Sequence, residues 1–486
     1  MRAIVAAVQL PAVSDIEFEA SLNELRELAK TLGYLVVGTF TQKRANFDTA
    51  AYLGVGKRQE IRRFVENEPA DDDDSPTTAD AKKDAQNAAK GSATKGSSTK
   101  GDIAKAKAAA ESAADPETRR ADVILIDHEI SPSQARHLEI EVGCEVMDRT
   151  MVILEIFHRH ASSRSARAQV EIARLGYMSP RLREAAKLAG SGGRQRSGTG
   201  GRGAGETHAA LDRQKIRNRI AELQLEITAM DAERQTQRAR RQAGQAGLGG
   251  QQLARVALVG YTNAGKSTLM RALTGSEVLV ANKLFATLDT TVRALHPETV
   301  PRVLVSDTVG FIKNLPHDLV ASFKSTLEEA AESSLLLHVI DASDPGFERQ
   351  LAVTDKVLAE IGADAVPRIR VFNKIDVVGA LMENAGAAQA EREAELRAQY
   401  PDCIVMSARR ESDVAKMHAA IVAFFQRGLI EAELFLPWSA QQLRGKIFAS
   451  CEVLAERADD DGAFLQVRGE SDTVKALQEQ LGVKLT

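Results

Sequence analysis

Short apolar runs alternate with longer amphipathic stretches in two separate parts of the chain. Alternation of this kind is typical of α/β domains, in which helices join parallel strands. The pattern predicts an N-terminal α/β domain over 1–150 and a doubly wound, mostly parallel sheet over 251–430. In the N-terminal domain we expect strands at 4–8, 35–39, 123–127 and 146–148, helices at 17–32 and 58–66, and a further helix starting at Ser131 and Pro132.

Residues 151–250, between these domains, have a helical period instead. Apolar side chains at 151–160 and 166–175 follow helical spacing. A later set recurs at intervals of 4, 3, 4 and 3 residues: Ile216, Ile220, Leu223, Ile227 and Met230. This spacing is a heptad seam, and it fits an intramolecular hairpin against residues 166–189 or a dimer. The short connection favours the hairpin, with the Gly/Arg-rich stretch 190–205 as its loop.

Two segments have a different character. Residues 431–486 contain a strand-like run at 464–467 and helical stretches near 441–449 and at 474–481, which predicts a small C-terminal α/β module. Residues 68–118 consist mainly of Ala, Asp, Lys, Ser, Thr and Gly, without apolar periodicity. Such a segment cannot bury enough apolar surface to offset its ordering entropy. We interpret it as a disordered, low-complexity insertion; a fraying Ala/Lys helix at 103–114 and a functional tail are the alternatives.

Composition narrows the class of protein. The chain has 486 residues, 44% of them hydrophobic, and can bury several cores. Cys144, Cys403 and Cys451 lie far apart, so neither a disulfide framework nor a zinc site is indicated. The first residues resemble a strand rather than a signal peptide, and no apolar run approaches the length of a membrane span. These features predict a cytoplasmic protein without integral membrane association.

Charge is uneven along the chain. The net charge is only −4, but residues 155–245 carry 18 Lys/Arg against 9 Asp/Glu. Within this region Arg194, Arg196 and Arg202 are interleaved with glycine. A flexible basic loop between two basic helices favours a grip on an RNA phosphate backbone. The alternative interpretation is a solvated, charged helix face.

The most informative stretch is 260–268, which follows the strand-like run 255–259 and precedes a helix from 266. It matches the phosphate-loop pattern GxxxxGK[ST]. Its glycines let backbone N–H groups face phosphate oxygens, and a helix N-terminus favours anions. Lys266 is the candidate contact for the β- and γ-phosphates, and the Ser267 hydroxyl is a candidate Mg²⁺ ligand. The candidate nucleotide-binding residues here are Gly260, Tyr261, Thr262, Asn263, Ala264, Gly265, Lys266, Ser267 and Thr268.

Three later motifs also follow strand-like runs. In Asp307-Thr308-Val309-Gly310, the aspartate can hold Mg²⁺ through water and Gly310 can offer its N–H to the γ-phosphate. In Asn373-Lys374-Ile375-Asp376, the last carboxylate can accept two hydrogen bonds from guanine, which adenine cannot supply. Lys374 can cover the base, and Asn373 can tie this loop to the phosphate loop. Ser407-Ala408-Arg409 can offer backbone N–H groups to guanine O6. Together the motifs predict GTP and GDP as ligands.

Residues 284–291 have the position of a mobile switch between the first helix and the next strand of the nucleotide domain. Thr287 can complete the Mg²⁺ shell when a γ-phosphate is present, with Thr290 and Thr291 as rival candidates. A turn cap is the plainer interpretation. The nucleotide-binding candidates in this segment are Phe285, Ala286, Thr287, Leu288 and Asp289. Lys266, Thr287 and Gly310 are the candidate catalytic residues, and Ser267 and Thr287 the candidate metal ligands.

With these motifs and those of the N-terminal part, the chain resembles the HflX family within the Obg-HflX group of GTPases. The resemblance is carried by 260–268, 284–291 and 307–312, by DHEISPSQARHLE at 127–139 and DRTMVILEIFHRHA at 148–161, and by the Gly/Arg loop ending at 205–207. It covers nearly the whole chain outside 68–118. Two departures are the missing proline in 286–290, where the family usually has ATLDPT, and the acidic insertion itself.

The resemblance implies a GTPase that binds the large ribosomal subunit and its RNA and splits or rescues stalled ribosomes under stress. The preference for an intramolecular hairpin over a dimer predicts a monomer. ATP binding by the N-terminal and helical region is also implied, without residues to assign to it. An alternative function is a GTP-dependent assembly or RNA-binding adaptor, in which binding rather than hydrolysis matters. After Gly310, where Ras-type enzymes have a glutamine that orients water, this chain has Phe311. We therefore expect slow intrinsic hydrolysis that the ribosome stimulates.

Overall fold

The computed structural model describes residues 1–67, 120–191, 204–246, 254–275, 284–285, 290–299, 302–313, 329–380 and 384–481. Its contacts divide the chain into one unit of 1–156 with 174–216 and a second of 157–173 with 217–486. The predicted insertion at 68–118 and most of the Gly/Arg-rich stretch lie outside the described residues. Within the described residues, no helix combines the length and apolarity needed to cross a bilayer.

The first unit contains a parallel sheet in the order β2-β1-β3-β4. Its strands are β1 (Arg2–Gln9), β2 (Leu35–Lys43), β3 (Val123–Ile126) and β4 (Glu145–Asp148). The same unit contains the helices α1 (Asp15–Thr31), α2 (Val55–Val65), α5 (Pro132–Val142) and the first part of α6 (Arg149–His160), together with parts of the two long helices described below. Ser131 caps α5 through a full capping box with Gln134, and Pro132 takes the first helical position, as predicted. The predicted α/β fold is confirmed.

A buried ionic network closes this sheet at the carboxyl ends of its strands. Arg149, 2% exposed, donates to Asp127 Oδ1 at 2.9 Å and to Glu24. Asp148, fully buried, accepts from the Met151 N–H and from the Arg181 guanidinium at 2.6 Å. Carboxylates this deep persist only when paired and hydrogen-bonded. The network therefore fixes the start of α6 and joins it to the following helix.

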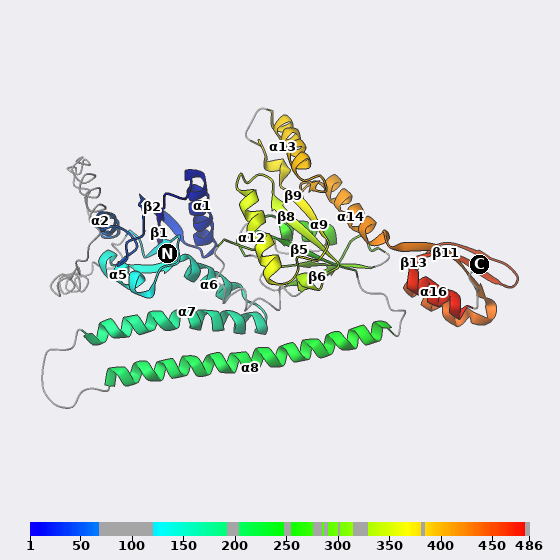
Figure 1. Ribbon diagram of the computed structural model, residues 1–486, viewed down its shortest axis with the longest axis horizontal. Helices are drawn as coiled ribbons and strands as arrows, with labels where there is room; N and C mark the ends of the chain where they lie inside the picture. The colour runs from blue at the N-terminus through cyan, green and yellow to red at the C-terminus, as the bar shows by residue number, and fades with distance from the viewer. Residues whose placement is uncertain are drawn as a thin grey trace. The chain divides into compact units, whose positions relative to one another are not determined.

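Two long helices form the predicted hairpin. They are α7 (Arg164–Ser191) and α8 (Ala204–Ala246). Figure 1 draws them as neighbours, and the Arg219 Nε–Glu171 Oε1 distance of 2.9 Å joins them. Leu223, at the centre of the predicted heptad seam, is 2% exposed. The contact supports the intramolecular pairing that the sequence favoured.

The second unit carries a six-stranded sheet in the order β10-β9-β8-β5-β7-β6. Its strands are β5 (Ala254–Gly260), β6 (Thr291–Ala294), β7 (Val303–Asp307), β8 (Leu335–Asp341), β9 (Arg368–Asn373) and β10 (Ile404–Val405). All pairings are parallel except β6 with β7. The sequence did not predict β6, because none of its four residues is buried.

Helices cover both faces of this sheet (Figure 1). One core brings α9 (Lys266–Thr274) and α14 (Glu411–Gln426) against it, and the other brings α12 (Phe347–Glu360) and α13 (Ala385–Gln399). A short 3₁₀ turn, η1 (Ile375–Val377), follows β9. This is the predicted doubly wound fold, with a single antiparallel strand at one edge.

The C-terminal module is an antiparallel sheet in the order β11-β13-β12, with helices on one face. Its elements are β11 (Leu429–Pro437), η2 (Trp438–Leu443), α15 (Arg444–Ser450), β12 (Glu452–Ala458), β13 (Gly462–Glu470) and α16 (Ser471–Gln480). The sequence predicted β13 and α16 but missed β11 and β12. The helix expected near 441–449 is divided between the 3₁₀ turn η2 and α15.

Candidate nucleotide-binding site

The phosphate loop joins β5 to α9 and depends on two glycines. Gly260 has φ +145°, and a Cβ there would lie 2.2 Å from the Val339 carbonyl oxygen. Gly265 has φ +97°, and a Cβ there would lie 2.2 Å from Asn373 Nδ2. Both positions combine left-handed backbone with close neighbours, so a side chain would open the loop. The predicted strand–loop–helix context of 260–268 is confirmed.

Lys266 is buried under this loop. Its Nζ donates to the carbonyl oxygens of Gly260 at 3.0 Å and Tyr261 at 2.9 Å. Burial lowers the pKa of this lysine to about 8, although the carboxylate of Asp307 opposes the shift. The ammonium is thus held by its own loop at the start of α9. From there a phosphate oxygen could replace the carbonyls as its partner.

A hydroxyl and a carboxylate meet beside the loop. Ser267 Oγ donates to Asp307 Oδ2 at 2.7 Å, and Asp307 is 1% exposed at the end of β7. Hydroxyl and carboxylate oxygens are the hard ligands that Mg²⁺ prefers, so the pair fits that ion. The other predicted ligand, Thr287, lies outside the described residues with Ala286, Leu288 and Asp289. Thr308, the neighbour of Asp307, donates to the Leu258 carbonyl and faces the sheet.

The segment after β7 is bonded to the phosphate loop. The Phe311 N–H donates to the Gly260 carbonyl at 3.1 Å, and the Thr262 N–H donates to the Phe311 carbonyl at 2.7 Å. A third bond runs from the Lys313 N–H to the Tyr261 phenol oxygen at 2.8 Å. A Cβ at Gly310 would lie 2.9 Å from Lys266 Nζ, so glycine allows this close approach. The two segments therefore form one hydrogen-bonded layer.

The Phe311 side chain is 1% exposed, so its ring is buried in the protein interior. A ring placed there cannot orient a water molecule by hydrogen bonding, which agrees with the expectation from its residue type. Val309 and Ile312 are buried as well. The sequence did not reveal the hydrogen bond of Tyr261, since its partner lies 52 positions along the chain.

Asn373 joins three loops. Its Nδ2 donates to the Ala264 carbonyl at 2.9 Å, and its Oδ1 accepts from the Ala408 N–H at 2.9 Å. The side chain is 2% exposed at the end of β9. The predicted tie between Asn373 and the phosphate loop is present. The same side chain also reaches the Ser407–Arg409 loop, which the sequence did not predict.

The loops around Asn373 have their own supports. Lys374 has φ +65°, and its Nζ lies 2.7 Å from Asp341 Oδ2. Asp376 follows in η1. The Ser407 N–H donates to Asp413 Oδ2 at 3.0 Å, and the Arg409 N–H donates to Ser407 Oγ at 3.2 Å. Sequence reasoning missed Asp341 and Asp413, although Asp341 ends a strand in the same way as the motifs that it did select.

Phe285 is the one described nucleotide-binding candidate of the switch segment. It is 3% exposed with φ +56°, and its ring meets that of Phe157 edge-on, with centroids 4.5 Å apart. Both residues belong to the second unit. The ring is therefore occupied by an apolar contact with Phe157.

Family models match most of the chain. A model described as 50S ribosome-binding GTPase matches 255–374. Models described as GTP-binding GTPase Middle Region and GTP-binding GTPase N-terminal match 160–241, and 19–72 with 90–158. A solved GTP-binding protein from Sulfolobus solfataricus in complex with GDP is 20% identical, with a TM-score of 0.40, over 87% of this chain and 100% of that one.

Curated relatives span the same regions. GTPase HflX of Gluconacetobacter diazotrophicus is 49% identical over 99% of this chain and 98% of its own. GTPase HflX of Caldanaerobacter subterraneus is 40% identical over 78% of this chain and 73% of its own. The family expected from the phosphate loop and the N-terminal motifs is confirmed. On the matches of its N-terminal, middle and nucleotide-binding regions, the chain belongs to the HflX family of GTPases.

Proposed function

We propose that this GTPase binds the large ribosomal subunit and couples GTP binding and hydrolysis to splitting or rescue of stalled ribosomes. The observation that carries the nucleotide part of the proposal is the Asn373 side chain, which joins its own loop at 373–376 to the phosphate loop and to the loop at 407–409. The match of 255–374 to a 50S ribosome-binding GTPase model supports the choice of partner. The 18 Lys/Arg against 9 Asp/Glu in 155–245 suit a contact with ribosomal RNA.

In this proposal Lys266 moves from its loop carbonyls to the β- and γ-phosphates. The backbone N–H groups of 263 and 265–267 surround the phosphate oxygens, whereas those of Thr262 and Ala264 already donate to carbonyls of Phe311 and Tyr261. Ser267, Thr287 and, through water, Asp307 hold Mg²⁺, which supplies positive charge to the β- and γ-phosphates when it is bound. Gly310 offers its N–H to the γ-phosphate. These groups position the phosphate and stabilise the charge that develops on it.

Guanine is selected by the loops that Asn373 joins. Asp376 accepts hydrogen bonds from the two donors of the guanine edge. All three N–H groups of Ser407–Arg409 have acceptors within the protein, so the one that donates to O6 exchanges its present acceptor for the base. Lys374, held by Asp341 at 2.7 Å, covers one face of the base. Because adenine lacks both donors, it would leave the carboxylate unmatched, which costs on the order of 1–3 kcal/mol for each lost bond.

Phe311 cannot orient the water molecule that attacks the γ-phosphate. We propose that binding to the ribosome fixes the switch segments and so completes the catalytic site. The test is GTP hydrolysis by the purified protein with and without large ribosomal subunits, with co-sedimentation in a non-hydrolysable GTP analogue. We expect strong stimulation and GTP-dependent binding. Equal turnover with and without subunits would show that the ribosome is not the activator.

A second candidate is a GTP-dependent assembly or RNA-binding adaptor, favoured by the basic helical region. The two functions differ in their need for hydrolysis. Replacing Asp307 with Asn weakens the proposed Mg²⁺ site and slows turnover in either case. Cells that survive ribosome stalling normally with this variant would support the adaptor, whereas loss of rescue would support the hydrolysis-driven function.

The pairing of α7 with α8 within one chain supports a monomer, because it buries Leu223 of the heptad seam without a second copy.

A further inference from the structure

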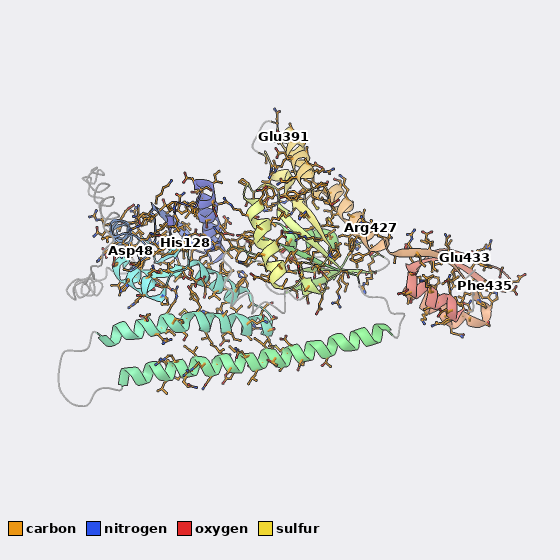
Figure 2. The ribbon with its side chains drawn as sticks, in the orientation of Figure 1. Asp48, His128, Glu391, Arg427, Glu433 and Phe435 are labelled. Carbon is orange, nitrogen blue, oxygen red and sulfur yellow. The ribbon has the colours of Figure 1, made fainter. Side chains whose placement is uncertain are left out.

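The C-terminal module has one open sheet face. Its core side chains point to one side, where α15 and α16 cover them: Leu434 and Leu436 from β11, Leu465 and Val467 from β13. Because alternate residues of a strand point to opposite faces, the remaining side chains form the outer face. Glu431, Glu433 and Phe435 are its members on β11, where Figure 2 labels the last two. No function described above uses this face.

The register places its side chains in rows across the three strands. One row is Phe435, Phe464 and Arg457. The two rings have centroids 4.8 Å apart, and the Arg457 guanidinium lies 5.0 Å from the Phe464 centroid. A Cβ at Gly462 would come within 2.8 Å of the Phe435 ring, so the ring can occupy this position only because residue 462 has no side chain. The face therefore has a built aromatic platform on which an arginine already stacks.

Around this platform the charge is negative. In a second row, Arg468 is neutralised between Glu431, at 2.5 Å, and Glu452, at 3.6 Å. Glu433 is exposed between the two rows. Asp459, Asp460 and Asp461 are exposed at the β12–β13 turn, where Trp438 donates to the Asp460 carbonyl at 3.1 Å. Over 429–481 the chain carries ten Asp/Glu and five Lys/Arg.

Aromatic rings on a sheet can stack nucleic-acid bases or receive cationic side chains. The carboxylates decide between these partners, since they repel a phosphate backbone and attract Lys and Arg. We propose that the outer face of the C-terminal module docks an arginine- and lysine-rich segment of a protein partner, with one cationic side chain over the Phe435 ring and another beside Glu433. This surface is separate from the nucleotide site, and the inference does not rest on the proposed ribosomal function.

The chain offers an internal probe for this surface. Trp438 is its single tryptophan and is 47% exposed beside the acidic turn, so its emission reports on this module alone. The full-length protein is titrated with a twelve-residue peptide of alternating Arg and Ala and, separately, with a twelve-nucleotide oligouridylate. We expect a saturable change in emission with the peptide and none with the RNA.

Charge reversal tests the location. Glu433→Lys exchanges an attraction for a repulsion on the outer face, and we expect peptide affinity to fall about fivefold. The matched control is Glu479→Lys, an equal change at an exposed position of α16, and it should leave affinity unchanged. The proposal is overturned by a peptide that produces no saturable change, by equal weakening in both variants, or by a response to oligouridylate in place of the peptide.

Discussion

Truncating Asn373 to alanine should weaken nucleotide binding without touching any nucleotide atom directly. The side chain makes two buried hydrogen bonds, one to the Ala264 carbonyl and one from the Ala408 N–H, each 2.9 Å long. Its removal leaves a carbonyl and an N–H without that partner in the interior, at about 1–3 kcal/mol each. Taking the lower value for both gives about 2 kcal/mol.

The loss of about 2 kcal/mol should appear as weaker binding of the nucleotide, because binding requires the phosphate loop and the loops at 373–376 and 407–409 to be ordered. A loss of about 2 kcal/mol corresponds to roughly 30-fold weaker binding. The assay is equilibrium titration with a fluorescent GDP analogue, which avoids assigning one unfolding energy to a multidomain chain. Asn373→Asp should be at least as weak, since it turns a carboxylate oxygen toward the Ala264 carbonyl.

The matched control is Asn384→Ala, at the exposed N-cap of α13, where the side chain makes no capping hydrogen bond. It should bind GDP as the unmodified protein does. If Asn373→Ala also bound GDP within twofold of the unmodified protein, the loops would be ordered by other contacts and the reasoning would be refuted.

Two further predictions concern the nucleotide site, and a third concerns the N-terminal unit. Tyr261→Phe removes the acceptor of the Lys313 N–H, so we expect GTP turnover to fall about fivefold while GDP affinity stays within twofold, measured by steady-state hydrolysis and titration. Burial lowers the pKa of Lys266 from 10.5 to about 8, so between these two pH values only the unfolded chain keeps the proton on this lysine. The contribution of Lys266 to the free energy of unfolding therefore rises with pH between 8 and 10.5. GDP affinity needs the ammonium, so it should fall above pH 8, by up to about tenfold per pH unit. A flat affinity profile from pH 7 to 10 would contradict this. Arg149→Met leaves buried Asp127 without its cation, and the free energy of opening of the N-terminal sheet should fall by about 3–5 kcal/mol, measured by amide hydrogen exchange in β3 and β4. Arg26→Met, at an exposed ion pair, should cost under about 1 kcal/mol.

The parts of the site that could be predicted from sequence are those fixed by local backbone chemistry. A glycine at a left-handed turn, a lysine that begins a helix and an asparagine that ends a strand all act within a few residues of their own position. The polar residues at the ends of β5, β7 and β9 therefore revealed the phosphate loop and its partners. The roles of the site residues toward GTP and Mg²⁺ stay predictions.

Long-range contacts were not predictable in this way. Nothing in the spacing of Tyr261 and Lys313 indicates that one phenol accepts a bond from the other residue's backbone. Strands without a buried face were also missed, because apolar alternation is the signal for a strand. β6 has no buried residue, and β12 has mostly exposed ones. The bounds proposed for the domains likewise stay predictions.

The length of α8 has a mechanical consequence. At 43 residues the helix is about 65 Å long. A rod of this length is a lever, so a rotation of about 10° at one end displaces the other by roughly 11 Å. The bond between Arg219 and Glu171 lies partway along this rod, so the same rotation about that contact moves the last residue of α8, about 40 Å away, by roughly 7 Å.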